Sequence, residues 1–390
     1  MSNLSKEQWR SFSQYLDEAL YQPDSDRAVW LARIAASDPL VAAELERKLA
    51  ARRHAAFDTF LSDSPFAGAA GNGSELIGKH VGPYLIDSEI GRGGMGSVWR
   101  GRRTDGKSNA LVAIKFVHTY WLGKASAEQF RGKKRLVGRL EHPNIERLIG
   151  AGIFNESQPY LALEYIEGEP ISGYCERLAL GVEARLALFG EVLAAVAHAH
   201  RHLIIHRDLN PTNIYVTADG VVKLLDFAIA KLLDEDAAAA ATQNYAMALS
   251  PQYAAPEQLL GQPITTATDV HGLGLVLYVL LAGEPAIAAE GRSNAELIRA
   301  VINEPPRRPS HTTGASIARR RALKGDLDNI ITKALKKDPS ERYASVDAFA
   351  DDLRRYLSHR PVRASPDSVA YRLGKFVRRM AAACRARTGF

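Results

Sequence analysis

One polar stretch constrains this chain more than any other: residues 206–213 read His-Arg-Asp-Leu-Asn-Pro-Thr-Asn. An apolar run with helical spacing, residues 182–201, precedes it, and an alternating strand pattern at 214–216 follows it. The proline and the polar residues of the stretch favour a loop. Such a loop holds the carboxyl of Asp208 and the amide of Asn213 in a fixed relation, so we expect both side chains to work at one site.

A second motif, Gly-Arg-Gly-Gly-Met-Gly-Ser-Val, spans residues 91–98 and lies between strand-like segments at 84–90 and 98–103. Backbone amides approach phosphate oxygens closely where no Cβ intervenes, so the glycines predict a phosphate-binding loop. A dinucleotide-binding site is the alternative, but it needs a helix after the glycines. A strand follows here, which favours a glycine-rich hairpin.

Further motifs follow in order: Leu-Val-Ala-Ile-Lys ends at Lys115, Lys-Leu-Leu-Asp-Phe-Ala spans 223–228, and Ala-Pro-Glu ends at Glu257. A single tripeptide of this kind recurs by chance, but the ordered set is specific. Over roughly residues 84–357 the chain resembles the protein kinase family. The resemblance implies an α+β, two-lobed kinase fold with a small β-rich N-lobe and a larger helical C-lobe. It also implies that Arg342 pairs with Glu257.

The resemblance assigns roles to individual side chains. Asp208 is expected to orient the acceptor hydroxyl, Lys115 to contact the α- and β-phosphates of ATP, and Asn213 with Asp226 to hold Mg²⁺. Asn210 stands in the catalytic loop where Ser/Thr kinases usually carry a lysine near the γ-phosphate. The other nucleotide-binding positions lie in the glycine loop, on the strand that ends at the lysine and at the hinge: Ile90, Gly91, Arg92, Gly93, Gly94, Gly96, Val98, Ala113, Leu163, Glu164 and Ile166.

Four positions depart from the family pattern. Lys133 stands where the family has a glutamate that pairs with the strand lysine. Two like charges about 4 Å apart repel by roughly 4 kcal/mol at an effective dielectric near 20, so Lys115 is expected to pair elsewhere, with Asp226 as the candidate. The other departures are Asn210, Ala228 in place of a glycine, and Leu-Ser-Pro-Gln at 249–252.

Composition divides the 390 residues into five parts. Residues 1–60 show three amphipathic helical patterns and form a small helical domain, in which Asp38 and Pro39 are expected to cap and open the third helix. Residues 61–79 have the glycine, serine and proline content of a linker. The N-lobe is expected at 80–167, the C-lobe at 168–357 and a basic tail at 358–390. The helical domain lacks clustered metal ligands, so docking or packing is its expected role.

The net charge of +6 is unevenly placed: residues 353–390 carry about +9, which leaves about −3 for the rest. The basic residues therefore belong to a tail, and no nucleic-acid partner is expected. Because apolar residues such as Leu373 and Phe376 are mixed with the arginines, we consider reversible contact with an anionic membrane, against the alternative of a solvated basic end. Two cysteines, a polar start and no apolar run longer than 270–282 predict a cytoplasmic protein, with the tail able to reach the inner membrane surface.

These observations predict an ATP-dependent kinase that transfers the γ-phosphate to Ser or Thr hydroxyls of a protein substrate in bacterial signalling. Retention of Lys115, Asp208, Asn213 and Asp226 favours catalysis, because a scaffold has no need of all four. Lys133 predicts weak transfer. A nucleotide-binding pseudokinase scaffold is the main alternative, and a regulator that binds nucleic acid through its tail is the third. ATP binding and phosphate transfer separate the three.

Overall fold

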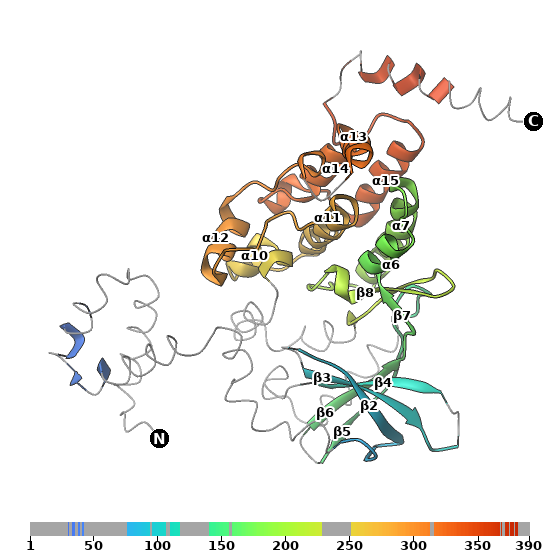
Figure 1. The fold of residues 1–390 in the computed structure, drawn as a ribbon, viewed down its shortest axis with the longest axis vertical. Coiled ribbons are helices and arrows are strands. Elements are labelled where there is room, and N and C mark those ends of the chain that lie inside the picture. Colours follow the sequence, from blue (N-terminus) through green and yellow to red (C-terminus); the bar gives the residue numbers. More distant parts are fainter. Residues whose placement is uncertain are drawn as a thin grey trace, which may run out of the picture. The chain divides into compact units, whose positions relative to one another are not determined.

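The chain forms two compact units, residues 1–75 and 76–390 (Figure 1). In the first unit Trp30, Ile34 and Val41 are buried, and Oδ1 of Asp38 accepts a hydrogen bond from the Val41 backbone N–H at 3.2 Å. Asp38 is therefore an N-cap, as predicted, whereas most of the predicted helical domain lies outside the described residues. The computed structural model describes residues 30, 33–35, 38, 39, 41, 42, 76–93, 96–106, 110–117, 140–155, 158–227, 251–312, 316–366, 368, 371–373, 375–377, 379 and 380.

The second unit begins with an antiparallel six-stranded sheet in the order β1-β2-β3-β4-β6-β5 (Figure 1). Its core face carries Ile86, Trp99 and Ile114, all fully buried. Every side chain of β4 except that of Leu111 is buried, as expected for a central strand rich in β-branched residues. The strands are β1 His80–Val81, β2 Tyr84–Gly93, β3 Gly96–Arg103, β4 Leu111–Val117, β5 Leu148–Phe154 and β6 Gln158–Glu164.

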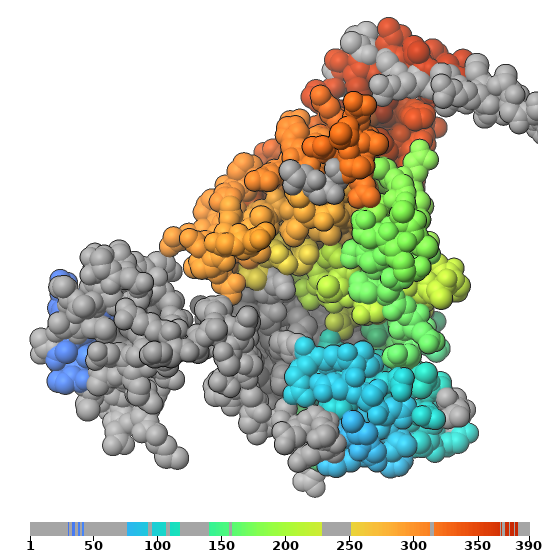
Figure 2. Space-filling view, viewed as in Figure 1, coloured from blue at the N-terminus to red at the C-terminus, as the bar shows by residue number. Residues whose placement is uncertain are grey.

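The C-lobe is organised around α11, Thr266–Ala282, which is buried on nearly every side. Arg185 of α7 ties this helix to its neighbours by donating to the carbonyl oxygens of Leu280 at 2.7 Å and Cys175 at 3.1 Å. The space-filling view (Figure 2) shows the cyan sheet residues at one end of this unit and the green to red helical residues in its larger part. The other described helices are α6 Ile171–Arg177, α7 Val182–Arg201, α10 Pro256–Leu259, α12 Asn294–Asn303, α13 Ile317–Leu323, α14 Asp326–Ala334 and α15 Val346–Leu357.

A small antiparallel sheet, β7-β8-β9, frames the polar loop found in the sequence. Its strands are β7 Gly168–Pro170, β8 Ile214–Thr217 and β9 Val222–Leu224. The loop and the short 3₁₀ helix η4, Pro211–Asn213, connect α7 to β8. The loop is therefore held at both ends by regular structure.

The observed elements confirm the fold class and several predicted boundaries. Helix α7 and strand β5 have the predicted limits, and the apolar run at 270–282 lies within α11. Strand β2 continues three residues beyond the predicted end at residue 90, because the glycine-rich hairpin pairs with β3 as far as Gly93 and Gly96. No helix in the described part of the chain has both the length and the apolar character needed to cross a bilayer.

The described part of the basic tail packs on the C-lobe. Lys375 forms an ion pair with Asp326 and is only 6% exposed, with its ammonium over the rings of Tyr356 and Tyr371. The hydroxyl of Tyr371 donates to Asp326 at 2.9 Å. These contacts attach the start of the tail to α14 and α15.

Candidate active site

The loop at residues 206–213 is attached to α11 by one buried carboxylate. Asp269 accepts hydrogen bonds from the backbone N–H groups of His206 at 2.8 Å and Arg207 at 2.9 Å. Arg207 has a φ of 71°, a left-handed conformation that costs energy in a residue with a Cβ. The two bonds to Asp269 supply the constraint that keeps the loop in this conformation.

A glycine of α11 permits the helix to approach the loop closely. A Cβ on Gly272 would lie 3.0 Å from the Cβ of Leu209 and 3.3 Å from its carbonyl oxygen, closer than ordinary van der Waals contact. Helix and loop therefore pack backbone against side chain with no room for a larger residue. The position of Leu209 fixes that of its neighbour Asp208.

Asp208 is fixed by the amides of two asparagines in its own loop. Nδ2 of Asn210 donates to Oδ1 of Asp208 at 3.2 Å, and Nδ2 of Asn213 donates to Oδ2 at 2.9 Å. Two donors on the two oxygens fix the plane of the carboxylate, which keeps further lone pairs for another donor. The structure thus brings together the three loop residues that were predicted to act at one site.

Asn210 is the departure from the family pattern that the structure describes most fully. Its Oδ1 accepts hydrogen bonds from the backbone N–H groups of Thr212 at 2.9 Å and Asn213 at 3.2 Å, so it is the N-cap of η4. Asn210 therefore shapes the loop as well as contacting Asp208. The departures at Lys133, Ala228 and residues 249–250 lie outside the described residues.

The strand lysine and the aspartate of the Asp-Phe pair meet directly. Nζ of Lys115 donates to Oδ1 of Asp226 at 2.7 Å, and Lys115 is only 6% exposed. This confirms the pairing expected from the lysine at position 133. Asp226 has a φ of 69°, so the site contains a second left-handed residue with a side chain.

His206 connects Asp226 with the loop that carries Asp208. Its Nε2 lies 2.9 Å from the carbonyl oxygen of Leu225, and its ring meets the edge of Phe227 at a centroid distance of 4.5 Å. The loop and the segment around Asp226 therefore share one rigid contact.

A glutamate that was not selected from the sequence also lies at this site. Oε2 of Glu146 accepts a hydrogen bond from the backbone N–H of Asp226 at 3.3 Å. Burial, and next the negative charge of Asp226, raise the pKa of the Glu146 carboxyl to about 8, although the Asp226 N–H and the charge of Lys115 oppose the shift. In the sequence an acid two residues before a strand carries no signal, because such acids are common on surfaces.

The sheet register aligns the glycine-rich hairpin with the lysine. Gly91 lies opposite Val98 across β2 and β3, and Val98 lies opposite Lys115 across β3 and β4. Gly96 has a φ of 140°, and a Cβ there would collide with the carbonyl oxygen of Phe116. Only glycine fits at this position, which lets the hairpin return close to the lysine strand.

The predicted adenine-side positions lie further along the same strands. Ala113 of β4 lies opposite Leu163 of β6, and both are buried. The Glu164 carboxylate is occupied by Nζ of Lys223 at 2.9 Å. Of the remaining nucleotide positions, Ile166 is half-buried, Gly94 lies outside the described residues, and the exposed ones are Ile90, Gly91 and Arg92.

Comparison with known proteins agrees with this geometry. Residues 84–353, more than half of the chain, match the family described as "Protein kinase domain". The chain belongs to the protein kinase family. Solved kinase domains share the fold: the PknI kinase domain of Mycobacterium tuberculosis aligns with a TM-score of 0.53 and 24% identity over 72% of this chain and 98% of that one.

Curated relatives of this kinase domain are bacterial. The probable serine/threonine-protein kinase PknB of Lactococcus lactis is 34% identical over 278 residues, which cover 69% of this chain and 41% of that protein. The serine/threonine-protein kinase Pkn1 of Myxococcus xanthus is 33% identical over 290 residues, which cover 73% of this chain and 39% of that protein. The kinase domain therefore matches well under half of each relative.

Protein kinases of this family use ATP and Mg²⁺, and the donor set fits both. Because the Asn213 amide nitrogen donates to Asp208, its carbonyl oxygen remains to bind a cation, as does the second carboxylate oxygen of Asp226. Mg²⁺ is usually held by a few protein oxygens together with substrate phosphates. Accordingly, the described residues contain no preformed cluster of three or more His, Cys, Asp or Glu side chains suited to a metal.

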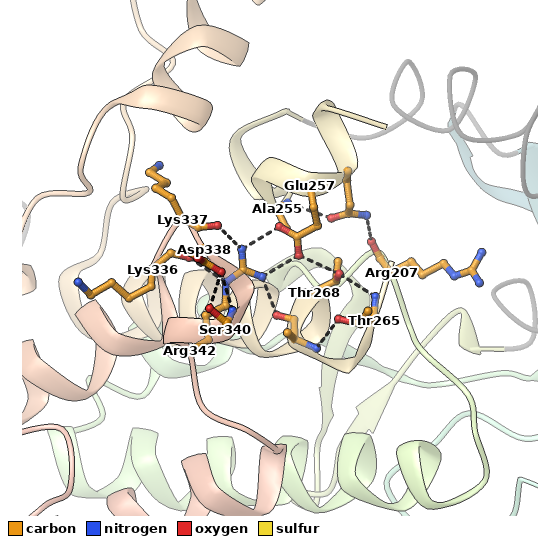
Figure 3. A network of polar contacts seen from close by, with 12 residues as sticks. Arg207, Ala255, Glu257, Thr265, Thr268, Lys336, Lys337, Asp338, Ser340 and Arg342 are labelled. Carbon is orange, nitrogen blue, oxygen red and sulfur yellow. Dashed lines mark hydrogen bonds and ion pairs between the residues drawn. The ribbon is translucent and has the colours of Figure 1, made fainter. Parts of the chain in front are cut away.

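A second polar network lies at the base of the C-lobe (Figure 3). Both guanidinium termini of Arg342 donate to the Glu257 carboxylate at 2.7 Å, which confirms the predicted pair. Thr268 donates to the same carboxylate at 2.8 Å. Burial by itself would raise the pKa of Glu257, but the hydrogen bonds and charge of Arg342 outweigh it, and the pKa is lowered. The network joins the loop through Gln258, whose Nε2 donates to the Arg207 carbonyl oxygen at 2.7 Å.

Proposed function

We propose that this kinase domain is an ATP-dependent Ser/Thr protein kinase that acts on a protein substrate in bacterial signalling. The observation that carries the proposal is the placement of Asp208. Its carboxylate is fixed by Asn210 and Asn213, in a loop joined through His206 to the segment that holds Asp226. A fixed carboxylate with free lone pairs beside two metal-binding oxygens is the arrangement that phosphoryl transfer to an alcohol requires.

Each side chain then has a defined task. Asp208 accepts a hydrogen bond from the substrate hydroxyl and orients it toward the phosphate. The Lys115 ammonium binds phosphate oxygens, for which it exchanges part of its contact with Asp226. Asn213 and Asp226 hold Mg²⁺, which when bound neutralises charge on the phosphates. Asn210 supplies a neutral donor where a lysine would supply a charged one, so we expect slower transfer than in kinases that have the lysine.

The relatives are named as serine/threonine-protein kinases, and their names give the pseudokinase alternative no support. The side chains agree with this preference. Lys115, Asp208, Asn213 and Asp226 are all placed at one site by regular structure. A scaffold that only binds nucleotide has no use for the constrained Asp208.

Transfer of ³²P from γ-labelled ATP, by the protein alone and with a generic acceptor protein, tests the proposal. We expect Mg²⁺-dependent labelling of Ser or Thr that is lost in Asp208→Ala, while nucleotide binding persists in that variant. Binding without transfer by the wild-type protein would identify a pseudokinase. Absence of nucleotide binding would refute the proposal altogether.

We also propose that the tail makes reversible contact with an anionic membrane at the cytoplasmic surface. Arg372 and Arg379 accompany an exposed apolar stripe at helical spacing, a combination typical of helices that bind anionic lipid. The stripe consists of Leu373, Phe376, Val377 and Met380, which are 61%, 51%, 58% and 50% exposed.

Co-sedimentation with vesicles containing anionic lipid tests this second proposal. We expect binding to fall in a Phe376→Ser, Val377→Ser double variant. The control is Leu203→Ser, which removes an 88% exposed leucine elsewhere on the C-lobe. Equal sedimentation of all three proteins, or equal binding to neutral vesicles, would contradict membrane contact through the stripe.

A further inference from the structure

Residues 144–146 run beside residues 224–226 as a short parallel ladder that ends in an unusual way. The Leu224 N–H donates to the Asn144 carbonyl oxygen at 2.8 Å, and the Glu146 N–H donates to the Leu224 carbonyl oxygen at 3.0 Å. The next bond of a parallel ladder would join the Asp226 N–H to the Glu146 carbonyl oxygen. Instead, the Asp226 N–H donates to the side chain, at Oε2 of Glu146.

The substitution of a side-chain oxygen for a backbone oxygen coincides with a change in backbone conformation. Asp226 has a φ of 69°, which takes the chain out of the ladder and turns its carboxylate to Lys115 at 2.7 Å. A left-handed aspartate in this setting has a partly buried N–H that the ladder no longer satisfies. The Glu146 side chain provides the missing acceptor, and so removes a cost that would oppose this conformation.

We propose that Glu146 is a positioning residue for Asp226, which holds the aspartate in the left-handed conformation that directs its carboxylate to Lys115 and to the bound metal ion. The inference rests on the proposed function, because it assigns Asp226 to Mg²⁺. It adds a residue that the resemblance to the kinase family did not select. Glu146 acts through the hydrogen bond that its oxygen accepts, and Asp226 makes the contact with the metal ion.

The surroundings of Glu146 indicate that an acceptor oxygen, rather than a negative charge, is what the site needs. Lys115 already has the Asp226 carboxylate, and Glu164 is paired with Lys223 at 2.9 Å. Burial raises the pKa of Glu146 to about 8, so its carboxyl is largely neutral near pH 7. Glutamine keeps the acceptor oxygen and the length of the side chain, whereas methionine keeps the length and removes the oxygen. The two variants therefore separate hydrogen bonding from space filling.

The test measures how much Mg²⁺ strengthens ADP binding, by isothermal titration in EDTA and in excess Mg²⁺. If Glu146 positions Asp226, Glu146→Met should lower this Mg²⁺-dependent gain by about 5- to 10-fold, a typical coupling between two bound groups. ADP affinity in EDTA should change little. Glu146→Gln should keep the wild-type gain to within about twofold, because it restores the acceptor. Glu141→Met, at an exposed glutamate five residues earlier, is the matched control and should leave both affinities unchanged.

Three outcomes would overturn the inference. A wild-type gain in Glu146→Met would show that the hydrogen bond does not position Asp226, and an equal loss in Glu146→Gln would show that charge rather than the acceptor matters. Equal weakening with and without Mg²⁺ would show a general structural role. Should Glu146→Met fail to fold in a thermal melt, Glu146→Ala applies the same comparison. A wild-type protein that binds no ADP would refute the proposed function itself, whereas the three outcomes above leave that function intact.

Discussion

Two buried cations of this kinase domain face carboxylates, and their surroundings differ. At the base of the C-lobe, Arg342 is 4% exposed and donates five hydrogen bonds, to Glu257 and to three carbonyl oxygens. At the site, Lys115 is 6% exposed and has one hydrogen-bond acceptor among the described residues, Asp226. The first cation is fully satisfied, and the second retains donors that a ligand could use.

The difference shows how the same ionic chemistry serves stability in one place and function in another. A buried pair whose partners are all satisfied resists exchange, because breaking it exposes an uncompensated charge. A pair with spare donors and a left-handed aspartate can exchange one partner for a phosphate or a metal ion at lower cost. Variants that change a carboxylate to its amide should therefore lower activity at the site and lower stability at the base.

The largest expected effect is on activity at the site. Asp208→Asn keeps the size of the side chain but removes the charge that draws the substrate proton. We expect the rate of phosphate transfer to fall by about 10²- to 10⁴-fold, the usual contribution of a positioned acid or base. Initial rates with γ-labelled ATP measure this, and the urea midpoint should stay near that of the wild-type protein. A rate within tenfold of wild type would show that Asp208 does not orient the hydroxyl.

The same chemical change at the base should act on stability. Glu257→Gln leaves the buried guanidinium of Arg342 without a counter-charge, so the free energy of unfolding should fall by about 3–5 kcal/mol. Urea unfolding followed by circular dichroism measures the change. Glu290→Gln, at an exposed position, should have almost no effect. Equal midpoints for the two variants would contradict a stabilising role for the buried pair.

The third prediction concerns the pH dependence of the base. Burial, and next the positive charges of Arg342 and Lys337, lower the pKa of His271 well below 6.5. The unfolded chain takes up a proton at this histidine as the pH falls below about 6.5, whereas the folded protein does not. The stability contribution is therefore complete above that pH and is lost as the pH falls further, by up to about 1.4 kcal/mol per pH unit.

Urea unfolding between pH 7.5 and pH 5, in about half-unit steps, tests this expectation. His271→Phe should reduce the slope of stability against pH by one proton. His142 and His198, whose pKa values burial also lowers, should supply the slope that remains. An unchanged slope in the variant would show that His271 is not held neutral.

The smallest effect should come from one neutral donor in the base network. Thr268→Val removes the hydroxyl that donates to Oε1 of Glu257 at 2.8 Å and preserves the shape of the side chain. We expect a loss of about 1–3 kcal/mol in the free energy of unfolding. The Asp208-dependent transfer rate should remain unchanged, and a fall in that rate would show that the base and the site are coupled.

Much of this architecture was predictable because local patterns record it. The helical spacing of residues 182–201 and the apolar run of 270–282 predicted α7 and the core of α11. The order of short motifs identified the family before any contact was known. Asp38 as a helix cap and the Arg342–Glu257 pair were predicted too, the first from cap chemistry and the second from the family resemblance.

The sequence by itself determined which side chains are available for chemistry and the order in which they occur. Tertiary structure decided which of them meet: the partner of Lys115, the alignment of Gly91, Val98 and Lys115, and the contact between Glu146 and Asp226. The physical reason is distance along the chain. Helical and strand periodicity act over a few neighbours, whereas strand register and buried hydrogen bonds join segments far apart in sequence, and these form only when the whole core packs.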